Sequence, residues 1–184
     1  MDELIRACRD GDTNAFEELI EHYGTTIERF AYQIGVPYDD IPDVSQEVFI
    51  RLYRFIDEFD GRSFTSWLYK ITLNIARDHS RKHISWMNKF SRLRQENKNT
   101  LPINVEEQVL ENEDSQILHG YIQQLDEKYR IPIVLYYFHD FTYEAISQIT
   151  NEKLSTVKVR LMRGKKLLAT KIEGEIAKGG NIHG

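Results

Sequence analysis

The chain has 184 residues, of which 41% are hydrophobic and 29% charged, a composition typical of soluble globular proteins. That length suffices for one medium domain or for two small ones. No apolar run approaches the about eighteen residues that a membrane helix needs, so we expect no membrane insertion.

The single cysteine, Cys8, cannot form a disulfide within the chain, which favours a reducing compartment. Cys8 follows Leu4 at helical spacing, so we expect it to pack in or near the core rather than to act as a reactive thiol. The N-terminal residues lack the basic-then-apolar order of a secretory signal. These features predict a cytoplasmic protein.

The net charge of −5 is distributed in four alternating blocks along the chain. Residues 1–60 carry 5 Lys and Arg against 15 Asp and Glu, and residues 99–150 carry 2 against 9. Residues 61–98 carry 9 against 2, and residues 151–184 carry 8 against 3. A net acidic charge argues against nucleic-acid binding only when charge is evenly spread. The two basic blocks therefore indicate two separate anion-binding surfaces.

Apolar residues recur at three- and four-residue steps in most of the chain, which is typical of amphipathic helices. The pattern predicts helices over residues 16–34, 44–59 and 64–82. Gly35, Pro37 and Pro42 are expected to end the first of them. Because no period-two alternation is long enough for a strand, we predict an all-α fold.

Periodicity fades over residues 85–104, which predicts a linker that is long for one compact domain. We therefore expect two small helical domains, residues 1–84 and 105–177, joined by this flexible linker, with a fraying tail at 178–184. In the second domain, Pro132 either places the start of a helix near Arg130 or kinks it.

Residues 142–166 have the pattern of a helix-turn-helix within that second domain. A short amphipathic helix over 142–150 is followed by the turn Asn151-Glu152-Lys153. Ser155 is predicted to cap the next helix. The face expected to pack inward comprises Val157, Leu161, Gly164 and Leu168.

The opposite face of that helix is mostly basic, and a second helix of this kind reads DNA in the major groove. The residues expected at the DNA are Ser155, Thr156, Lys158, Val159, Met162, Arg163 and Lys166. Lys158 and Arg163 suit guanine O6 and N7, whereas the hydroxyls of Ser155 and Thr156 suit phosphate. The alternative is a plain solvated helix face, because Lys and Arg are good helix formers.

Aromatic and basic residues also interleave over residues 59–82. The aromatic ones are Phe59, Phe64, Trp67 and Tyr69, and the basic ones are Arg62, Lys70, Arg77, Arg81 and Lys82. Such a mixture holds single-stranded nucleic acid, and a short loop at Asp60–Ser63 suits an extruded base. The alternative is that most of these rings, Trp67 included, belong to the core, because their spacing is helical.

No catalytic, metal-binding or cofactor motif stands out. Asp78, His79 and His83 lack further ligands at known spacing and have basic neighbours, so we reject a metal site there. The phosphate-binding loop and the nucleophile elbow are both missing from the sequence. We therefore expect no metal, no cofactor and no enzymatic activity.

Two segments together resemble one family. DVSQEVFIRLYRFIDEFDGRSFTSWLYKITLNIARDHSRK, residues 43–82, is similar to region two of the bacterial sigma factors of the extracytoplasmic-function group. LDEKYRIPIVLYYFHDFTYEAISQITNEKLSTVKVRLMRGKKLL, residues 125–168, is similar to their region four. These proteins are promoter-specificity subunits of RNA polymerase, and the order and spacing of both segments agree with the family.

The resemblance implies a role for each surface. The beta-prime clamp helices of core RNA polymerase would dock on a polar helix face comprising Asp43, Gln46, Glu47, Arg51 and Arg54. The minus-ten element of promoter DNA would be bound by Asp60, Gly61, Arg62, Ser63, Phe64, Asn74 and Arg77. The basic helix face at 155–166 would read the minus-thirty-five element. The beta flap and an anti-sigma factor are the other partners that the family implies.

Two other classes of protein remain as alternatives. A stand-alone helix-turn-helix regulator would bind duplex DNA tightly without polymerase, usually at a two-fold symmetric site. A DNA-acting enzyme such as a recombinase would require a nucleophile or a metal site, neither of which the sequence provides.

Overall fold

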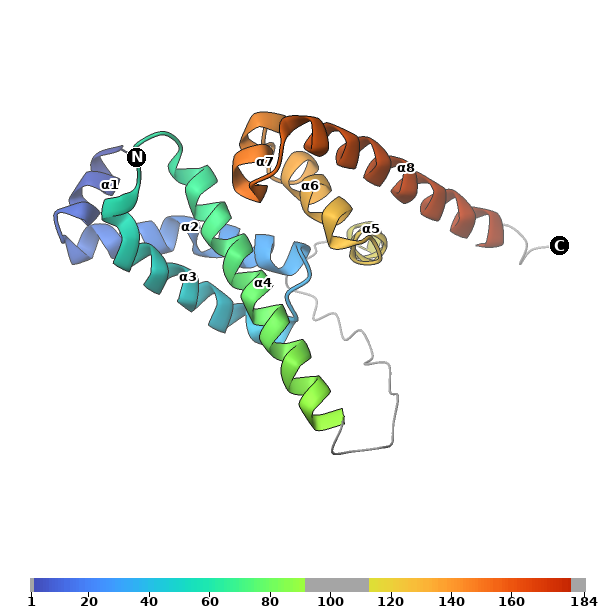
Figure 1. Ribbon diagram of the computed structural model, residues 1–184, viewed down its shortest axis with the longest axis horizontal. Coiled ribbons are helices and arrows are strands. Elements are labelled where there is room, and N and C mark those ends of the chain that lie inside the picture. The colour runs from blue at the N-terminus through green and yellow to red at the C-terminus, as the bar shows by residue number, and fades with distance from the viewer. Residues whose placement is uncertain (1, 92–112, 180–184) are drawn as a thin grey trace.

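The structure, a computed structural model, describes residues 2–91 and 113–179. Every regular element in these two ranges is helical, so the all-α prediction is confirmed (Figure 1). The N-terminal bundle comprises α1 (Asp2–Arg9), α2 (Thr13–Gln33), α3 (Ile41–Phe55) and α4 (Phe64–Ser91), with short 3-10 helices η1 (Tyr38–Asp40) and η2 (Ile56–Glu58). The C-terminal bundle comprises α5 (Glu113–Gln123), α6 (Glu127–Tyr137), α7 (Tyr143–Thr150) and α8 (Leu154–Gly179).

Local signals explain where α2 and α3 begin and end. The Asp12 carboxylate accepts hydrogen bonds from the amides of Asn14 (2.9 Å) and Ala15 (3.3 Å) and so caps α2. Gly35, with φ of +100°, ends it in the left-handed conformation that glycine tolerates. We predicted that Pro42 would help to end this helix, and that prediction is wrong. Pro42 lies in the first turn of α3, where a proline needs no amide donor.

Two further boundaries differ from the predictions. Helix α4 continues to Ser91, so residues 85–91 of the expected linker are helical. Loss of apolar periodicity does not end a helix that contains no Pro or Gly, because extending a formed helix costs little. Pro132 lies inside α6, which begins at Glu127 rather than near Arg130. The rest of the expected linker, residues 92–104, lies outside the described residues.

The apolar faces of the helices form one continuous core that spans both bundles. In the N-terminal bundle Leu19, Phe30 and Leu68 are completely buried, and in the C-terminal bundle so are Val134 and Ile146. Cys8 is buried, as its spacing predicted. Helix α7 of the C-terminal bundle packs against α4 of the N-terminal bundle, so the two bundles lie in contact (Figure 1). Across the two described ranges, no helix combines the length and apolarity of a membrane span.

Candidate nucleic-acid interface

The C-terminal bundle contains the predicted helix-turn-helix. The Thr142 hydroxyl caps α7 by accepting from the Ala145 amide at 3.2 Å. Asn151 ends α7 in the left-handed conformation, with φ of 56° and ψ of 42°. Its amide and that of Glu152 both donate to the Ser147 carbonyl, which fixes the turn into α8. The expected turn at residues 151–153 is therefore confirmed.

Helix α8 begins two residues earlier than a cap at Ser155 would place it. Its first residue is Leu154, and the Val157 amide donates to the Lys153 carbonyl at 3.1 Å. Accepting this first bond is the role of an N-cap residue, so Lys153 occupies that position. The assignment of Ser155 as N-cap is wrong, and Ser155 is instead an exposed residue in the first turn.

The inward face of α8 is the predicted one. Val157 is completely buried, and Leu161 is 6% exposed. Gly164 is buried at the crossing with α6, where an added Cβ would lie 3.2 Å from the Ile133 side chain. Only a residue without a side chain allows the helices to approach this closely. Leu168 is half-buried against the core.

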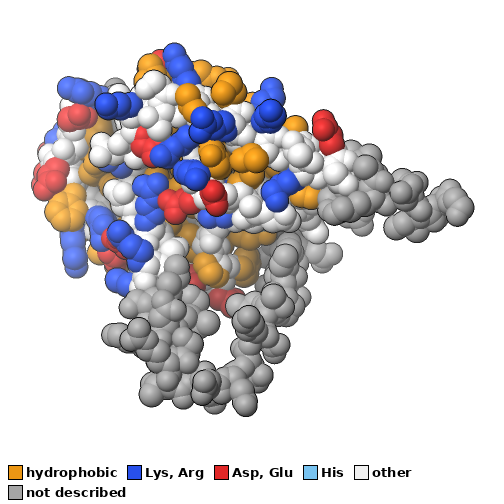
Figure 2. All heavy atoms as spheres, turned by 45° about the vertical axis from the view of Figure 1, so that its right-hand side comes forward, with side chains coloured by type: hydrophobic (Ala, Val, Ile, Leu, Met, Phe, Trp, Pro, Cys, Tyr) orange, Lys and Arg blue, Asp and Glu red, His pale blue; other side chains and the backbone are white. Residues whose placement is uncertain are grey.

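The opposite face of α8 projects into solvent. Most of its predicted DNA-binding residues are exposed, namely Ser155, Lys158, Val159, Met162, Arg163 and Lys166, and Thr156 is half-buried. Val159 and Met162, the two apolar residues of this face, are 41% and 65% exposed. Figure 2 shows Lys and Arg gathered on the face from which α8 projects, with apolar side chains between them.

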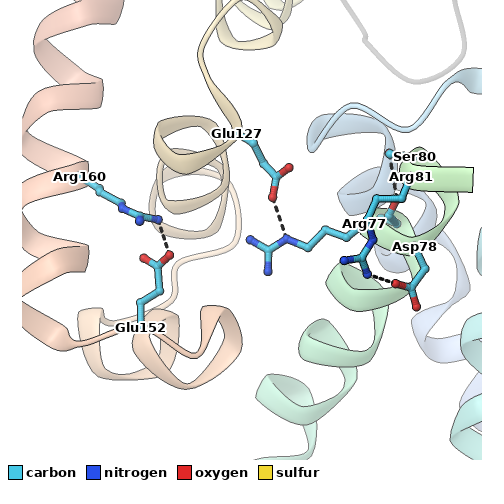
Figure 3. A network of polar contacts seen from close by, with 8 residues as sticks. Arg77, Asp78, Ser80, Arg81, Glu127, Glu152 and Arg160 are labelled. Carbon is cyan, nitrogen blue, oxygen red and sulfur yellow. Dashed lines mark hydrogen bonds and ion pairs between the residues drawn. The ribbon is translucent and has the colours of Figure 1, made fainter. Parts of the chain in front are cut away.

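One basic residue of this helix has a different role. The Arg160 guanidinium forms an ion pair with the Glu152 carboxylate in the turn before α8 (Figure 3). Their side chains are 27% and 20% exposed, so the pair is largely sheltered. Arg160 therefore braces the turn, whereas Lys158, Arg163 and Lys166 are exposed on the outward face.

The second candidate surface begins with the loop between η2 and α4. The Asp60 carboxylate accepts from the Arg62 amide at 3.1 Å, and Gly61 has φ of +79°. The Ser63 hydroxyl accepts from the Ser66 amide at 3.3 Å and thereby caps α4. The loop thus has a defined conformation held by its own side chains, with Asp60, Gly61, Arg62 and Ser63 all exposed.

Buried aromatic side chains flank this loop and anchor both of its ends. Phe59 and Phe64 are 7% and 6% exposed and pack edge to face, with ring centroids 5.6 Å apart. Phe64 therefore offers no exposed ring to a base and instead anchors the start of α4. Trp67 packs against the same cluster but is only half-buried, so the expected core placement holds for part of its ring.

Beyond the loop, two residues of α4 differ in their exposure. Asn74 is exposed. Arg77 is half-buried, and its Nε lies 2.7 Å from the Glu127 carboxylate of α6, in the other bundle (Figure 3).

The predicted protein-docking face of α3 is accessible along its length. Asp43, Gln46, Glu47 and Arg54 are exposed and Arg51 is half-buried, with a 3.3 Å ion pair between Glu47 and Arg51. The face borders a groove of about 670 Å³ between α2 and α3. Gln46 and Arg54 line this groove beside Phe16, Ile20 and Tyr53.

A polar network that the sequence did not reveal joins the two bundles. The imidazole of His139, in the loop after α6, lies 2.7 Å from the Tyr69 hydroxyl of α4 and 2.8 Å from Gln33 Oε1 at the end of α2. Because Gln33 Oε1 only accepts, His139 Nε2 carries the proton and Nδ1 accepts from Tyr69. Burial, together with the positive charge of Arg29, lowers the pKa of His139 to about 4.

Contacts around the end of α2 extend the network. The Gln123 side-chain amide donates to the Gln33 carbonyl at 2.8 Å. Gly35 leaves room for the side chains of Gln123 and Arg130, whose atoms would lie 2.9 and 3.1 Å from an added Cβ. Nearby, Tyr32 and His119 stack with ring centroids 4.2 Å apart, and burial lowers the pKa of His119 to about 4.

Sequence reasoning also missed Arg9 at the end of α1. Its Nη2 donates to the carbonyls of Asp57 (2.9 Å) and Phe59 (3.1 Å), directly before the loop. No local pattern reveals a contact between residues so far apart in the chain.

Three or more potential metal ligands never cluster within residues 2–91 and 113–179. Asp78 pairs with Arg81 (Figure 3). His79 lies 3.8 Å from Asp40, and the side chain of His83 lies outside the described residues.

An exposed helix-turn-helix on one bundle and a structured aromatic-basic loop on the other define a two-module nucleic-acid-binding protein. Comparison with known sequences identifies the family. Residues 19–85 match Sigma-70 region 2, and residues 115–168 match Sigma-70, region 4.

The chain is 31% identical over 177 residues to the ECF RNA polymerase sigma factor SigW of Bacillus subtilis, with 89% of this chain and 92% of the relative covered. It is 31% identical over 178 residues to the ECF RNA polymerase sigma-E factor of Escherichia coli K12, with 92% and 93% covered. The chain therefore belongs to the extracytoplasmic-function (ECF) sigma factors of the sigma-70 family.

Solved structures share the fold. CnrH in complex with the cytosolic domain of CnrY superposes with a TM-score of 0.68 at 22% identity, covering 93% of this chain and 96% of the other. The sigma factor RpoE in complex with the anti-sigma factor NepR from Bartonella quintana gives 0.70 at 20% identity, covering 86% and 96%.

Proposed function

We propose that the two nucleic-acid surfaces of this sigma factor divide promoter recognition between them. The observation that carries the proposal is the exposed basic face of α8, presented by a helix-turn-helix whose other face is buried. A stand-alone regulator would account for that face, but not for the structured aromatic-basic loop on a second bundle. As an ECF sigma factor, the chain is an alternative sigma factor that directs promoter-specific transcription initiation.

The face of α8 would read the minus-thirty-five element in the major groove. Lys158 and Arg163 suit guanine O6 and N7 as donors. Val159 and Met162 would contact thymine methyl groups, which explains why such apolar side chains remain exposed. Lys166, farther along the helix, would neutralise a phosphate.

The loop Asp60–Ser63 would hold an extruded base of the minus-ten element. A loop already fixed by its own hydrogen bonds loses little conformational entropy when a base enters. Phe64 would act indirectly, by anchoring the loop at the start of α4. Asn74 and Arg77 would contact the melted strand along α4. Melting would be favoured because a base released from the stack would find the polar groups of the loop already in place.

The polar face of α3, from Asp43 to Arg54, would dock on the beta-prime clamp helices of core polymerase, and the C-terminal bundle would meet the beta flap. The chemistry of RNA synthesis would remain with polymerase, so this chain would be no enzyme and would act in the cytoplasm. The two structures of similar fold are complexes with CnrY and with the anti-sigma factor NepR, which supports an anti-sigma factor for this chain as well.

Run-off transcription with purified core polymerase tests the proposal. We expect transcripts from specific genomic fragments only when the chain is present, and weak binding of the isolated chain to duplex promoter DNA. A mobility-shift assay without polymerase is the companion experiment. Tight, specific binding by the chain alone, with no chain-dependent transcript, would support the stand-alone regulator instead.

A further inference from the structure

We propose that Arg9 positions the loop that binds the minus-ten element, an inference that rests on the proposed function of that loop. Arg9 lies at the end of α1, outside the segment that matches Sigma-70 region 2. Its guanidinium reaches across the bundle to the carbonyls of Asp57 and Phe59, at 2.9 and 3.1 Å.

The two carbonyls lie where the geometry of the loop is set. The Asp57 carbonyl lies within the short helix η2, and the Phe59 carbonyl directly follows that helix. Carbonyls at the end of a helix have no partner within the helix. A guanidinium supplies several donors in a rigid plane, so one side chain fixes two carbonyls at once. Phe59 is also held by its buried ring, against Phe64 and Trp67. Because Phe59 is held at both its carbonyl and its ring, the position of Asp60, the first residue of the loop, is fixed as well.

The test is made on the holoenzyme with fork DNA whose minus-ten strand is single-stranded. The measured quantity is the ratio of affinities for the matched strand and for a strand substituted at the extruded base. Arg9→Ala is expected to lower this ratio several-fold, and Arg9→Lys to restore only part of it because Lys lacks the planar fork. Arg6→Ala is the matched control, since Arg6 is an exposed cation on the same helix.

Each outcome decides a different point. If Arg9 only stabilised the fold, Arg9→Ala would weaken binding of both strands equally and leave the ratio unchanged. An unchanged ratio in Arg9→Ala, or an equal fall of the ratio in Arg6→Ala, overturns the assignment. If the unmodified holoenzyme shows no preference between the strands, the proposed function of the loop fails rather than the role of Arg9.

Discussion

The two surfaces proposed to bind nucleic acid differ in how accessible they are. The outer face of α8 projects into solvent, so the side chains proposed to read DNA are already exposed, and Val157, Leu161 and Gly164 hold the helix in place. The surface proposed for the minus-ten element is structured but partly occupied, because Glu127 holds Arg77 and α7 borders the loop. The difference suggests that the first surface needs only rigidity, whereas the second also needs release. The experiments below are arranged by the size of the effect that this comparison predicts.

The largest effect is expected where α8 is anchored. Val157→Asp would bury an unpaired carboxylate and destabilise the C-terminal bundle by about 4 kcal/mol or more. Thermal unfolding measures the loss, with Val159→Asp as the matched control two residues away on the exposed face. Equal losses of melting temperature in both variants would contradict the assignment of the two faces.

A smaller effect is expected at the base-reading position of α8. Arg163→Ala should reduce discrimination at the minus-thirty-five element by about 1–3 kcal/mol, the range for a bidentate base contact. Competition between matched and substituted promoters, with the holoenzyme, measures it. Lys165→Ala, an exposed cation on the same helix, should leave the discrimination unchanged. If Arg163→Ala also leaves it unchanged, Arg163 is not a base reader.

Lys166→Ala should weaken promoter binding evenly across sequences, because a phosphate contact carries no sequence information. The slope of log affinity against log salt should become less steep by about 1. A salt titration of the holoenzyme on one promoter measures that slope. An unchanged slope together with altered sequence preference would show that Lys166 contacts a base.

The smallest effect is expected from pH, and it acts on the contact between the two bundles. His139 and His119 have pKa values lowered to about 4 by burial, against an ordinary value of 6.5. Between pH 6.5 and 4 these histidines would bind more protons in separated bundles than in packed ones, so falling pH favours separation and rising pH favours packing. Near His139 the charges of Arg29 and Asp140 act in opposite directions, and the Tyr69 hydroxyl stays protonated because burial raises its pKa.

Scattering measured from pH 7 to pH 4 should therefore show the radius of gyration increasing toward acid. His139→Gln combined with His119→Gln should flatten this dependence, because neither position then titrates. A radius that stays constant in the unmodified chain down to pH 4 would contradict the link between these histidines and the packing of the two bundles.

Sequence periodicity was sufficient for the inward face of α8. Val157, Leu161 and Gly164 recur at helical steps, and the same three residues are buried in the structure. Periodicity was insufficient for the helix start, since a serine in the first turn looks the same in sequence as a serine at the cap. It also failed at the end of α4, where apolar residues become sparse but the helix continues to Ser91.

Long-range polar contacts were not predictable from the sequence. Arg9 reaches residues 48 and 50 positions away, and His139 meets partners from two other helices. Such contacts depend on how the bundles pack, and no local spacing encodes that. Phe64 illustrates the converse: its basic neighbours allowed a surface role, its helical spacing allowed a core role, and the structure buries its ring in the core.

The central claim is that each surface reads its own promoter element. The most direct test measures holoenzyme preference across a promoter library for Arg163→Ala and for Asn74→Ala, side by side. The account predicts that Arg163→Ala changes preferences only at the minus-thirty-five element and Asn74→Ala only at the minus-ten element. Changes at the same element in both variants, or none in either, would contradict it.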